Sequence, residues 1–196
     1  MIDADQDRRF TLPATLDLCK ALARVDRFDL DVAAEAGHSC ADAFIDADAD
    51  GLASEWAGRV WCNPPFSDCG AWVRKAHEQV AKKSVILVAM LLPATRTEQV
   101  WWQVSVQPWL VMSRHSSGVE ISANFLPGRT KFGTPDDPTA DRQGSPKGGC
   151  VLLVFRPFTV DRRTGAEFFR DEKARQQFAR RHPDAIFETS GDSDRG

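Results

Sequence analysis

The apolar and polar positions along the chain predict strands and helices in turn. The most apolar segment, residues 84–92, is continuous, which is the pattern of a parallel strand buried on both faces. Residues 28–32 alternate apolar and charged positions, and residues 59–62 form a second short apolar stretch, so both are predicted to be strands. Further strands are expected at residues 109–112, 119–132 and 149–156.

Apolar residues that recur at helical spacing predict helices between these strands. Thr97 is expected to cap one of them. Residues 35–58 are rich in alanine, aspartate and glycine, so we expect a loop with short helical pieces there. The predicted helices cover residues 14–25, 71–82, 95–106 and 165–181.

Strands that alternate with helices in the middle of the chain favour an α/β fold with a parallel sheet. The length of 196 residues fits one domain, expected over residues 1–185, with a disordered tail over residues 186–196. Residues 133–148 contain three prolines and almost no apolar residue, which is typical of a mobile loop. Ligands of α/β sheets bind beyond the carboxyl ends of strands, so the segments that follow strands 28–32 and 59–62 are candidate sites.

Acidic and basic residues are unevenly distributed, although the formal net charge is only −3. Residues 1–60 carry 13 acids and 6 bases, a balance of −7, which leaves 15 acids and 19 bases, a balance of +4, for residues 61–196. Two interpretations stay open. The charge is either plain surface variation, or an acidic half holds a cationic ligand and a basic half faces phosphates.

The sequence disfavours several kinds of site and location. The apolar run at residues 85–94 is shorter than the roughly 20 residues of a membrane span. The acidic, polar start does not resemble a signal peptide, and the five cysteines form no CxxC pair. We therefore expect a cytoplasmic protein with reduced thiols and no metal, either zinc or calcium, the latter considered at Asp46, Asp48 and Asp50.

Residues 61–69, WCNPPFSDC, combine an asparagine, two prolines and an aromatic residue directly after a predicted strand. Pro64 and Pro65 fix two φ angles and remove two backbone donors, so the segment can continue neither a strand nor a helix. It is predicted to be a stiff corner that presents Asn63 and Phe66. A purely structural interpretation stays open, in which Phe66 packs in the core beside a proline-rich turn.

A rigid asparagine suits chemistry at an exocyclic amine. The N6 lone pair of adenine is delocalised into the ring, and two acceptors aimed at its N–H bonds would favour a pyramidal, nucleophilic nitrogen. The Asn63 side-chain oxygen and the Pro64 carbonyl could supply these acceptors, because the prolines hold the geometry ready. Phe66 could stack on a base that is flipped out of a duplex.

Several segments match one known family in order. They are FDLDVAA, CADAF, DADGL, EWAGRVWCNPPFSDCGAWVRKA, LLPATRTEQVWW, LPGRTKF and CVLLVF. NPPF is similar to the (D/N/S)PP(Y/F) signature of S-adenosylmethionine-dependent amino-methyltransferases. The whole series resembles the phage-type, Dam-like DNA N6-adenine methyltransferases of phages and prophages, over about residues 10–157.

The resemblance implies a Rossmann-like methyltransferase sheet with flanking helices, S-adenosyl-L-methionine as cofactor, and methylation of adenine N6 in double-stranded DNA. One glycine, Gly37, stands where many methyltransferases carry a glycine-rich loop, and the short distance from Asp31 to Asn63 predicts a sheet trimmed in its N-terminal half. The resemblance also implies a catalytic role for Asn63, Pro64, Pro65 and Phe66, and cofactor binding by Thr11, Pro13, Asp31, Ala33, Asp50 and Leu52.

Arg129 and Lys131 flank a predicted hairpin beside residues 133–148, and Arg156 follows the closing strand. We expect these bases to contact the DNA backbone, with plain surface charge as the alternative. Two other functions stay open. The same corner could methylate a planar amine or amide in RNA or protein, or the chain could be a non-catalytic DNA-binding relative.

Overall fold

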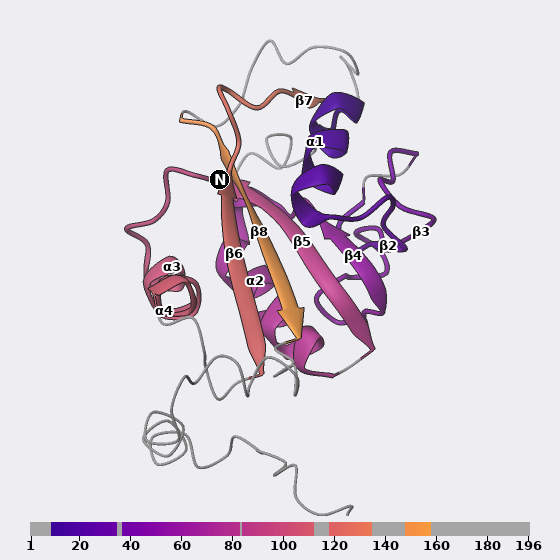
Figure 1. Ribbon diagram of the computed structural model, residues 1–196. Helices are drawn as coiled ribbons and strands as arrows, with labels where there is room; N and C mark the ends of the chain where they lie inside the picture. The colour runs from indigo at the N-terminus through magenta and orange to yellow at the C-terminus, as the bar shows by residue number, and fades with distance from the viewer. Residues whose placement is uncertain (1–8, 35–36, 83, 112–117, 135–147, 158–196) are drawn as a thin grey trace, which may run out of the picture.

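The computed structural model describes residues 9–34, 37–82, 84–111, 118–134 and 148–157 (Figure 1). The predicted helix at 165–181, the tail from residue 186 and most of the predicted loop at 133–148 lie outside the described residues.

The core of the fold is a six-stranded sheet in the order β3-β2-β4-β5-β8-β6 (Figure 1). The strands are β2 (Leu30–Asp31), β3 (Ala43–Phe44), β4 (Gly58–Cys62), β5 (Val85–Pro93), β6 (Val119–Phe125) and β8 (Cys150–Pro157). β2 pairs in parallel with both β3 and β4, and β4 pairs in parallel with β5. β8 is antiparallel to both β5 and β6, so β6 runs in the direction of β5. The carboxyl ends of β2, β4, β5 and β6 therefore meet at one edge of the sheet, which we call the carboxyl edge.

Helices cover both faces of this sheet (Figure 1). α1 (Pro13–Ala23) buries Cys19 and Ala23 against one face, and α2 (Cys69–Ala81) covers the other. α3 (Val100–Ser105) and α4 (Gln107–Val111) lie on the same face as α2, where Trp102 and Val106 join its core. The α/β class predicted from the alternation of elements is confirmed.

Local signals explain where the two longer helices begin and end. Pro13 starts α1 without losing a hydrogen bond, because the first N–H groups of a helix have no intrahelical partner. Arg24 ends it in the left-handed region, at φ 55°, and its N–H bonds the Ala21 carbonyl at 3.1 Å. Asp68 caps α2 by accepting from the Ala71 N–H at 3.3 Å.

The N-terminal half of the sheet is trimmed, as the short spacing from Asp31 to Asn63 predicts. The described residues between β2 and β4 hold one strand of two residues, β3, and no helix. β2 itself has two residues instead of the five predicted at 28–32. The chain thus passes from Asp31 to the corner with few elements in between.

A separate two-stranded sheet ties the start of the described chain to the segment after β6. β1 (Phe10–Thr11) pairs antiparallel with β7 (Phe132–Gly133). Gly133 is required there because a Cβ would overlap the Phe10 ring. The Phe10 ring also stacks on the His38 ring, at a centroid distance of 3.8 Å.

Several predictions of secondary structure were wrong. The strand predicted at 119–132 ends at Phe125, and the described residues from 37 to 58 contain no helical piece. Residues 109–111 are not a strand, because they belong to helix α4, and the Leu110 N–H bonds the Val106 carbonyl at 3.2 Å. A short apolar run does not distinguish a buried strand from a helix. Thr97 does not cap a helix either, because α3 begins later, after Gln99.

Candidate active site

The predicted corner stands at the carboxyl edge. β4 ends at Cys62, Asn63 to Pro65 follow in irregular structure, and a single 3₁₀ turn at Phe66–Asp68 leads into α2. The Asp68 N–H bonds the Pro65 carbonyl at 3.2 Å and closes that turn. The prolines therefore lie between strand and turn, where their missing donors cost no ladder bond.

Asn63 is held in one orientation by the backbone of a distant segment. Its Nδ2 donates to the Arg9 carbonyl at 3.2 Å, just before β1. Its Oδ1 is buried and has no hydrogen-bond partner in the described part of the chain. A flipped amide would set oxygen against the Arg9 carbonyl oxygen, so this orientation is the favourable one. Leaving a buried acceptor unmatched costs about 1–3 kcal/mol, which marks Oδ1 as an atom that awaits a donor.

The Pro64 carbonyl is the second acceptor at the corner. Pro64 is buried, and its carbonyl has no hydrogen-bond partner among the described residues. The predicted pair of acceptors is thus present on consecutive residues, and neither oxygen is already occupied by a described group.

Phe66 is half-buried, so both interpretations of its role stay open, stacking on a base and packing in the core. Its ring meets the Phe132 ring edge-on, with centroids 5.9 Å apart and planes at 82°. It packs against both layers of the core, yet part of its surface remains accessible. The Phe66 carbonyl accepts from the Arg96 guanidinium at 3.2 Å and from the Cys69 thiol at 3.4 Å.

Asp31 lies at the end of β2, in register with Trp61 of β4, so Asn63 follows two residues beyond its partner. Its side chain is almost fully buried, and it accepts from the Ala33 N–H at 3.2 Å and the Cys40 N–H at 2.9 Å. Burial raises the pKa of the Asp31 carboxyl to about 6, although both backbone donors act in the opposite direction. The structure therefore holds a carboxylate near the corner that is readily protonated.

Thr11 joins this group from β1. It is buried, and its Oγ1 has no hydrogen-bond partner in the described residues. Its backbone amide interacts with the Cys40 thiol, and the backbone N–H of Cys40 donates to the Asp31 carboxylate. Pro13 is exposed at the start of α1, where its role in helix initiation accounts for it.

Asp50 and Leu52 are placed by a tight turn that packs on the chain after β2. Asp50 adopts φ 53°, and its Oδ1 accepts from the Leu52 N–H at 2.9 Å. Gly51 lies between them and is buried. A Cβ at this position would overlap the Val32 carbonyl oxygen, so the turn requires glycine. Its own carbonyl accepts from the Trp56 indole at 2.8 Å. Gly51 was assigned no role from the sequence, although its position inside DGL was a usable signal.

The two predicted DNA-binding residues lie together, and the third basic residue does not. Arg129 and Lys131 are exposed on the segment that joins β6 to β7, at the carboxyl edge. Arg156 is near the end of β8, which runs the other way, so it lies at the opposite edge. There it donates to the Ala23 carbonyl at 2.7 Å, at the end of α1. Arg156 therefore does not lie beside Arg129 and Lys131, as sequence order had suggested.

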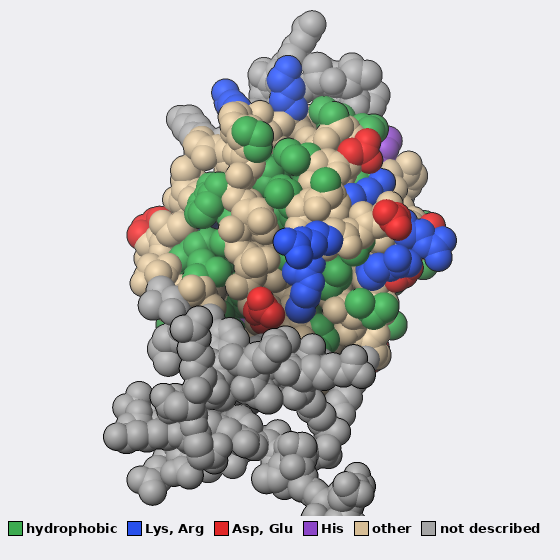
Figure 2. Space-filling model, viewed as in Figure 1, with side chains coloured by type: hydrophobic (Ala, Val, Ile, Leu, Met, Phe, Trp, Pro, Cys, Tyr) green, Lys and Arg blue, Asp and Glu red, His purple; other side chains and the backbone are tan. Residues whose placement is uncertain are grey.

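Basic side chains gather on the α1 face of the molecule (Figure 2). A hollow of about 640 Å³ there is lined by Arg24, Arg59 and Arg156, together with Asp26 and Glu120. The Arg59 guanidinium forms an ion pair with Asp29, with 2.6 Å between Nη2 and Oδ1, so part of the positive charge of this hollow is neutralised. The hollow lies at the amino ends of β4 and β5, away from the corner.

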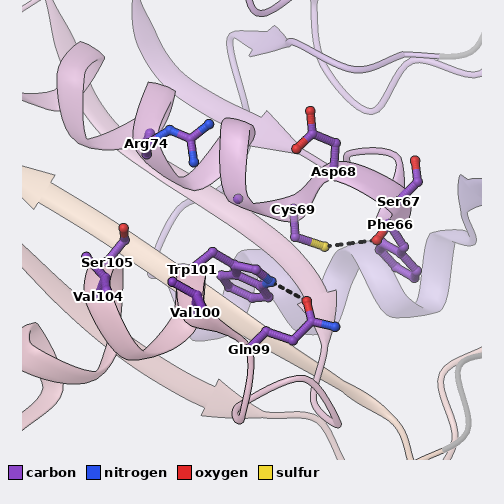
Figure 3. Close-up of a pocket in the computed structure, with 11 residues that line it drawn as sticks. Phe66, Ser67, Asp68, Cys69, Arg74, Gln99, Val100, Trp101, Val104 and Ser105 are labelled. Atoms are coloured by element: carbon purple, nitrogen blue, oxygen red, sulfur yellow. Dashed lines mark hydrogen bonds between the residues drawn. The ribbon is translucent and has the colours of Figure 1, made fainter.

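A second hollow adjoins the corner. It measures about 380 Å³ and lies between the start of α2 and α3, with Phe66 and Asp68 at one end and Arg74 on α2 (Figure 3). Trp101 forms its wall, and its indole donates to the Gln99 side chain at 2.6 Å. The sequence singled out neither Arg74 nor Arg96, although both belong to segments that match the family.

The described part of the chain contains no group of three or more His, Cys, Asp or Glu side chains able to hold a metal ion. None of the described helices combines the length and the apolar character that crossing a bilayer requires.

A comparison with curated proteins finds no match. Among solved structures, the chain is similar to PH1948 from Pyrococcus horikoshii, described as an RNA methyltransferase, with 15% identity and a TM-score of 0.35 over 63% of this chain and 52% of that one. It thus spans about half of that protein. It is also similar to the 23S rRNA methyltransferase ErmE, with 13% identity and a TM-score of 0.45 over 81% of this chain and 75% of that one.

The family model that matches is decisive, because it spans most of the chain. It is described as DNA N-6-adenine-methyltransferase (Dam), and it matches residues 4–178, which include every element of the site. The chain belongs to the DNA N-6-adenine-methyltransferase (Dam) family.

Proposed function

We propose that this protein transfers a methyl group from S-adenosyl-L-methionine to the exocyclic N6 amine of adenine in double-stranded DNA. Family membership implies the cofactor and the type of reaction. The observation that carries the proposal for this chain is the buried, unpartnered Oδ1 of Asn63. An N–H of the substrate amine is the donor that this acceptor lacks.

The corner then acts on the amine through two hydrogen bonds. Asn63 Oδ1 accepts one N6 proton and the Pro64 carbonyl accepts the other, which favours a pyramidal nitrogen with an exposed lone pair. The bond from Nδ2 to Arg9 keeps Oδ1 in place before the substrate arrives, so little reorganisation is needed. The alkylated amine loses a proton readily, so no strong base is needed at the corner. Phe66 stacks on the flipped base with its accessible surface.

The residues around Asp31 fit a cationic cofactor. When bound, S-adenosyl-L-methionine supplies an electrophilic methyl group on a sulfonium centre. The Asp31 carboxylate attracts the positive charge, and the orphan hydroxyl of Thr11 offers a hydrogen bond on the same side of the site. Ala33 acts through its backbone N–H, which orients Asp31, and the turn at Asp50 and Leu52 closes the pocket beside β2.

Arg129 and Lys131 hold the DNA backbone at the carboxyl edge, so that the duplex lies over the corner. We further propose that residues 1–185 act as one domain, and that the protein works in a bacterial cytoplasm on phage or host DNA, as the resemblance to phage and prophage methylases suggests.

Incubation with the cofactor and one duplex, followed by mass spectrometry of the nucleosides, tests the function. We expect N6-methyladenine to form in double-stranded DNA, and to be absent when Asn63→Ala replaces the wild type. The same sequence as RNA, and a protein mixture, serve as parallel substrates. Methylation of either of these without N6-methyladenine in DNA would contradict the proposal, and so would DNA binding without any cofactor binding in calorimetry.

A further inference from the structure

Arg96 is a basic residue that connects to the corner from a neighbouring element. It lies in the connection between β5, which ends at Pro93, and α3, which begins at Val100. β5 is next to β4 in the sheet, with Met90 opposite Cys62, so the segments that follow the two strands are neighbours at the carboxyl edge.

Arg96 reaches the corner through the backbone. Its guanidinium donates to the Phe66 carbonyl at 3.2 Å, in the 3₁₀ turn directly after the two prolines. A guanidinium carries five N–H donors in a planar fork, and this bond uses one of them. Among the described residues the Arg96 guanidinium makes no ion pair and no other hydrogen bond, although the residue is half-buried. Most of the fork is thus available to an anion.

The segment that carries Arg96 is also tied to the one that carries Arg129 and Lys131. The Ala94 N–H donates to the Gly149 carbonyl at 3.1 Å, and Gly148 packs so closely on Thr95 that a Cβ would overlap its methyl group. A Cβ on Gly149 would lie 2.9 Å from the Gly128 carbonyl oxygen. Contacts therefore run without a break from Arg96 through the start of β8 to the residue before Arg129.

We propose that Arg96 binds a phosphate of the target DNA strand and, through the Phe66 carbonyl, couples that contact to the geometry of the corner. This inference rests on the proposed function. Arg96 adds its charge to that of Arg129 and Lys131, whose segment is tied to its own. Bidentate guanidinium–phosphate bonds fix position as well as charge, so the phosphate that Arg96 holds sets where the flipped adenine stands relative to Asn63. Arg96 is a positioning residue, because it acts on the reaction through Phe66.

Three substitutions of Arg96 distinguish its charge contact with a phosphate from the bidentate geometry that positions the adenine. Arg96→Gln loses both the charge and the fork, so the salt dependence of DNA affinity should fall by about one counterion and kcat by about tenfold or more. Arg96→Lys keeps the charge and loses the fork, so the salt slope should persist while kcat falls by about tenfold or more. Arg96→Ala should show both losses. Arg74→Gln, which removes a guanidinium from α2 at the hollow next to the corner, is the matched control and should change neither quantity.

DNA affinity is measured by fluorescence anisotropy over a series of salt concentrations, and kcat at saturating DNA. Cofactor affinity and melting temperature are recorded for each variant and should stay at the wild-type values. A wild-type salt slope and kcat in Arg96→Ala would overturn the proposal. Equal losses of melting temperature and cofactor affinity in all three variants, with the slope unchanged, would also overturn it, since Arg96 would then only brace the fold. If the wild type forms no N6-methyladenine, the proposed function fails, while the salt slope still tests the phosphate contact.

Discussion

The side-chain amide of Asn63 donates to the backbone carbonyl of Arg9, 54 residues earlier in the chain, at 3.2 Å. This bond fixes the orientation of the amide, and Oδ1 has no partner in the described residues. The strand that carries the reacting corner and the segment that leads into β1 therefore share the task of orienting one amide.

Replacing Asn63 by alanine should abolish most of the activity without affecting the fold. We expect Asn63→Ala to bind S-adenosyl-L-methionine normally and to lose methyl transfer by at least about a hundredfold, which is the scale of removing one oriented transition-state contact. Asn63→Asp keeps an acceptor but repels the Arg9 carbonyl, so it should retain more activity than the alanine variant. Single-turnover assays measure both.

Asn124→Ala provides a matched control, because Asn124 also donates to a backbone carbonyl, that of Leu152, at 3.4 Å, but lies on β6 away from the corner. Near-normal turnover in Asn63→Ala, or an equal loss in Asn124→Ala, would remove the assignment of the catalytic corner.

Cofactor affinity should depend on pH through Asp31. Burial raises the pKa of its carboxyl to about 6, from an ordinary value of 3.8, so the group is largely protonated below pH 6 in the free protein. A cationic cofactor prefers the charged form, and affinity should therefore rise as the pH increases through about 6 and level off above it. Asp31→Asn should bind more weakly at pH 8 and show no such rise.

Calorimetric titrations between pH 5 and pH 8 at constant ionic strength test this. Asp17→Asn, at an exposed position on α1, should retain the wild-type profile. A flat profile in the wild type, or an unchanged profile in Asp31→Asn, would place the cofactor elsewhere.

The glycine inside the DGL turn should be more sensitive than its neighbours. A Cβ in Gly51→Ala would overlap the Val32 carbonyl oxygen and approach the Trp72 ring to 2.8 Å, so the turn at Asp50 and Leu52 must move away from β2. We expect cofactor affinity to fall by about tenfold or more, in proportion to the loss of one or two polar contacts.

Gly118→Ala is the comparison for this variant. Gly118 adopts φ +68°, where alanine is strained by about 1–2 kcal/mol, but a Cβ there meets nothing within 4 Å. It should lower the free energy of unfolding and leave cofactor affinity alone. If both variants lose stability equally and bind the cofactor equally well, the turn does not border the pocket.

The corner could be predicted from the sequence because its cause is local. Pro64 and Pro65 exclude regular structure by themselves, and the apolar residues of β4 and α2 on either side show where the strand ends and the helix starts. Residues 109–112 show the limit of such reasoning. A short run of apolar residues suits a strand or a helix equally well. The segment is helical because Trp102 and Val106, which precede it, pack into the core.

The long-range ties of the site could not be predicted. No periodicity reports that Asn63 meets Arg9, that Arg96 meets Phe66, or that Gly133 must be small for Phe10. From the sequence, Arg156 was grouped with Arg129 because the closing strand follows the segment that carries Arg129. The antiparallel direction of β8 carries it to the opposite edge.

The basic residues at the two edges of the sheet should behave differently toward DNA. Arg129→Ala and Lys131→Ala should weaken DNA binding to a similar degree for every sequence, and each should reduce the salt dependence of affinity by about one counterion, because phosphate contacts carry charge but no base information. Cofactor affinity should stay unchanged.

Arg156→Gln also removes one charge, but from the opposite edge, where the side chain donates to the Ala23 carbonyl at 2.7 Å. It should lower the melting temperature and leave the salt slope intact. The opposite pattern, with a reduced slope in Arg156→Gln and a lower melting temperature in Arg129→Ala, would move the DNA to the α1 hollow and away from the corner. Since a duplex bound there could not deliver an adenine to Asn63, that result would also require a second binding mode for catalysis.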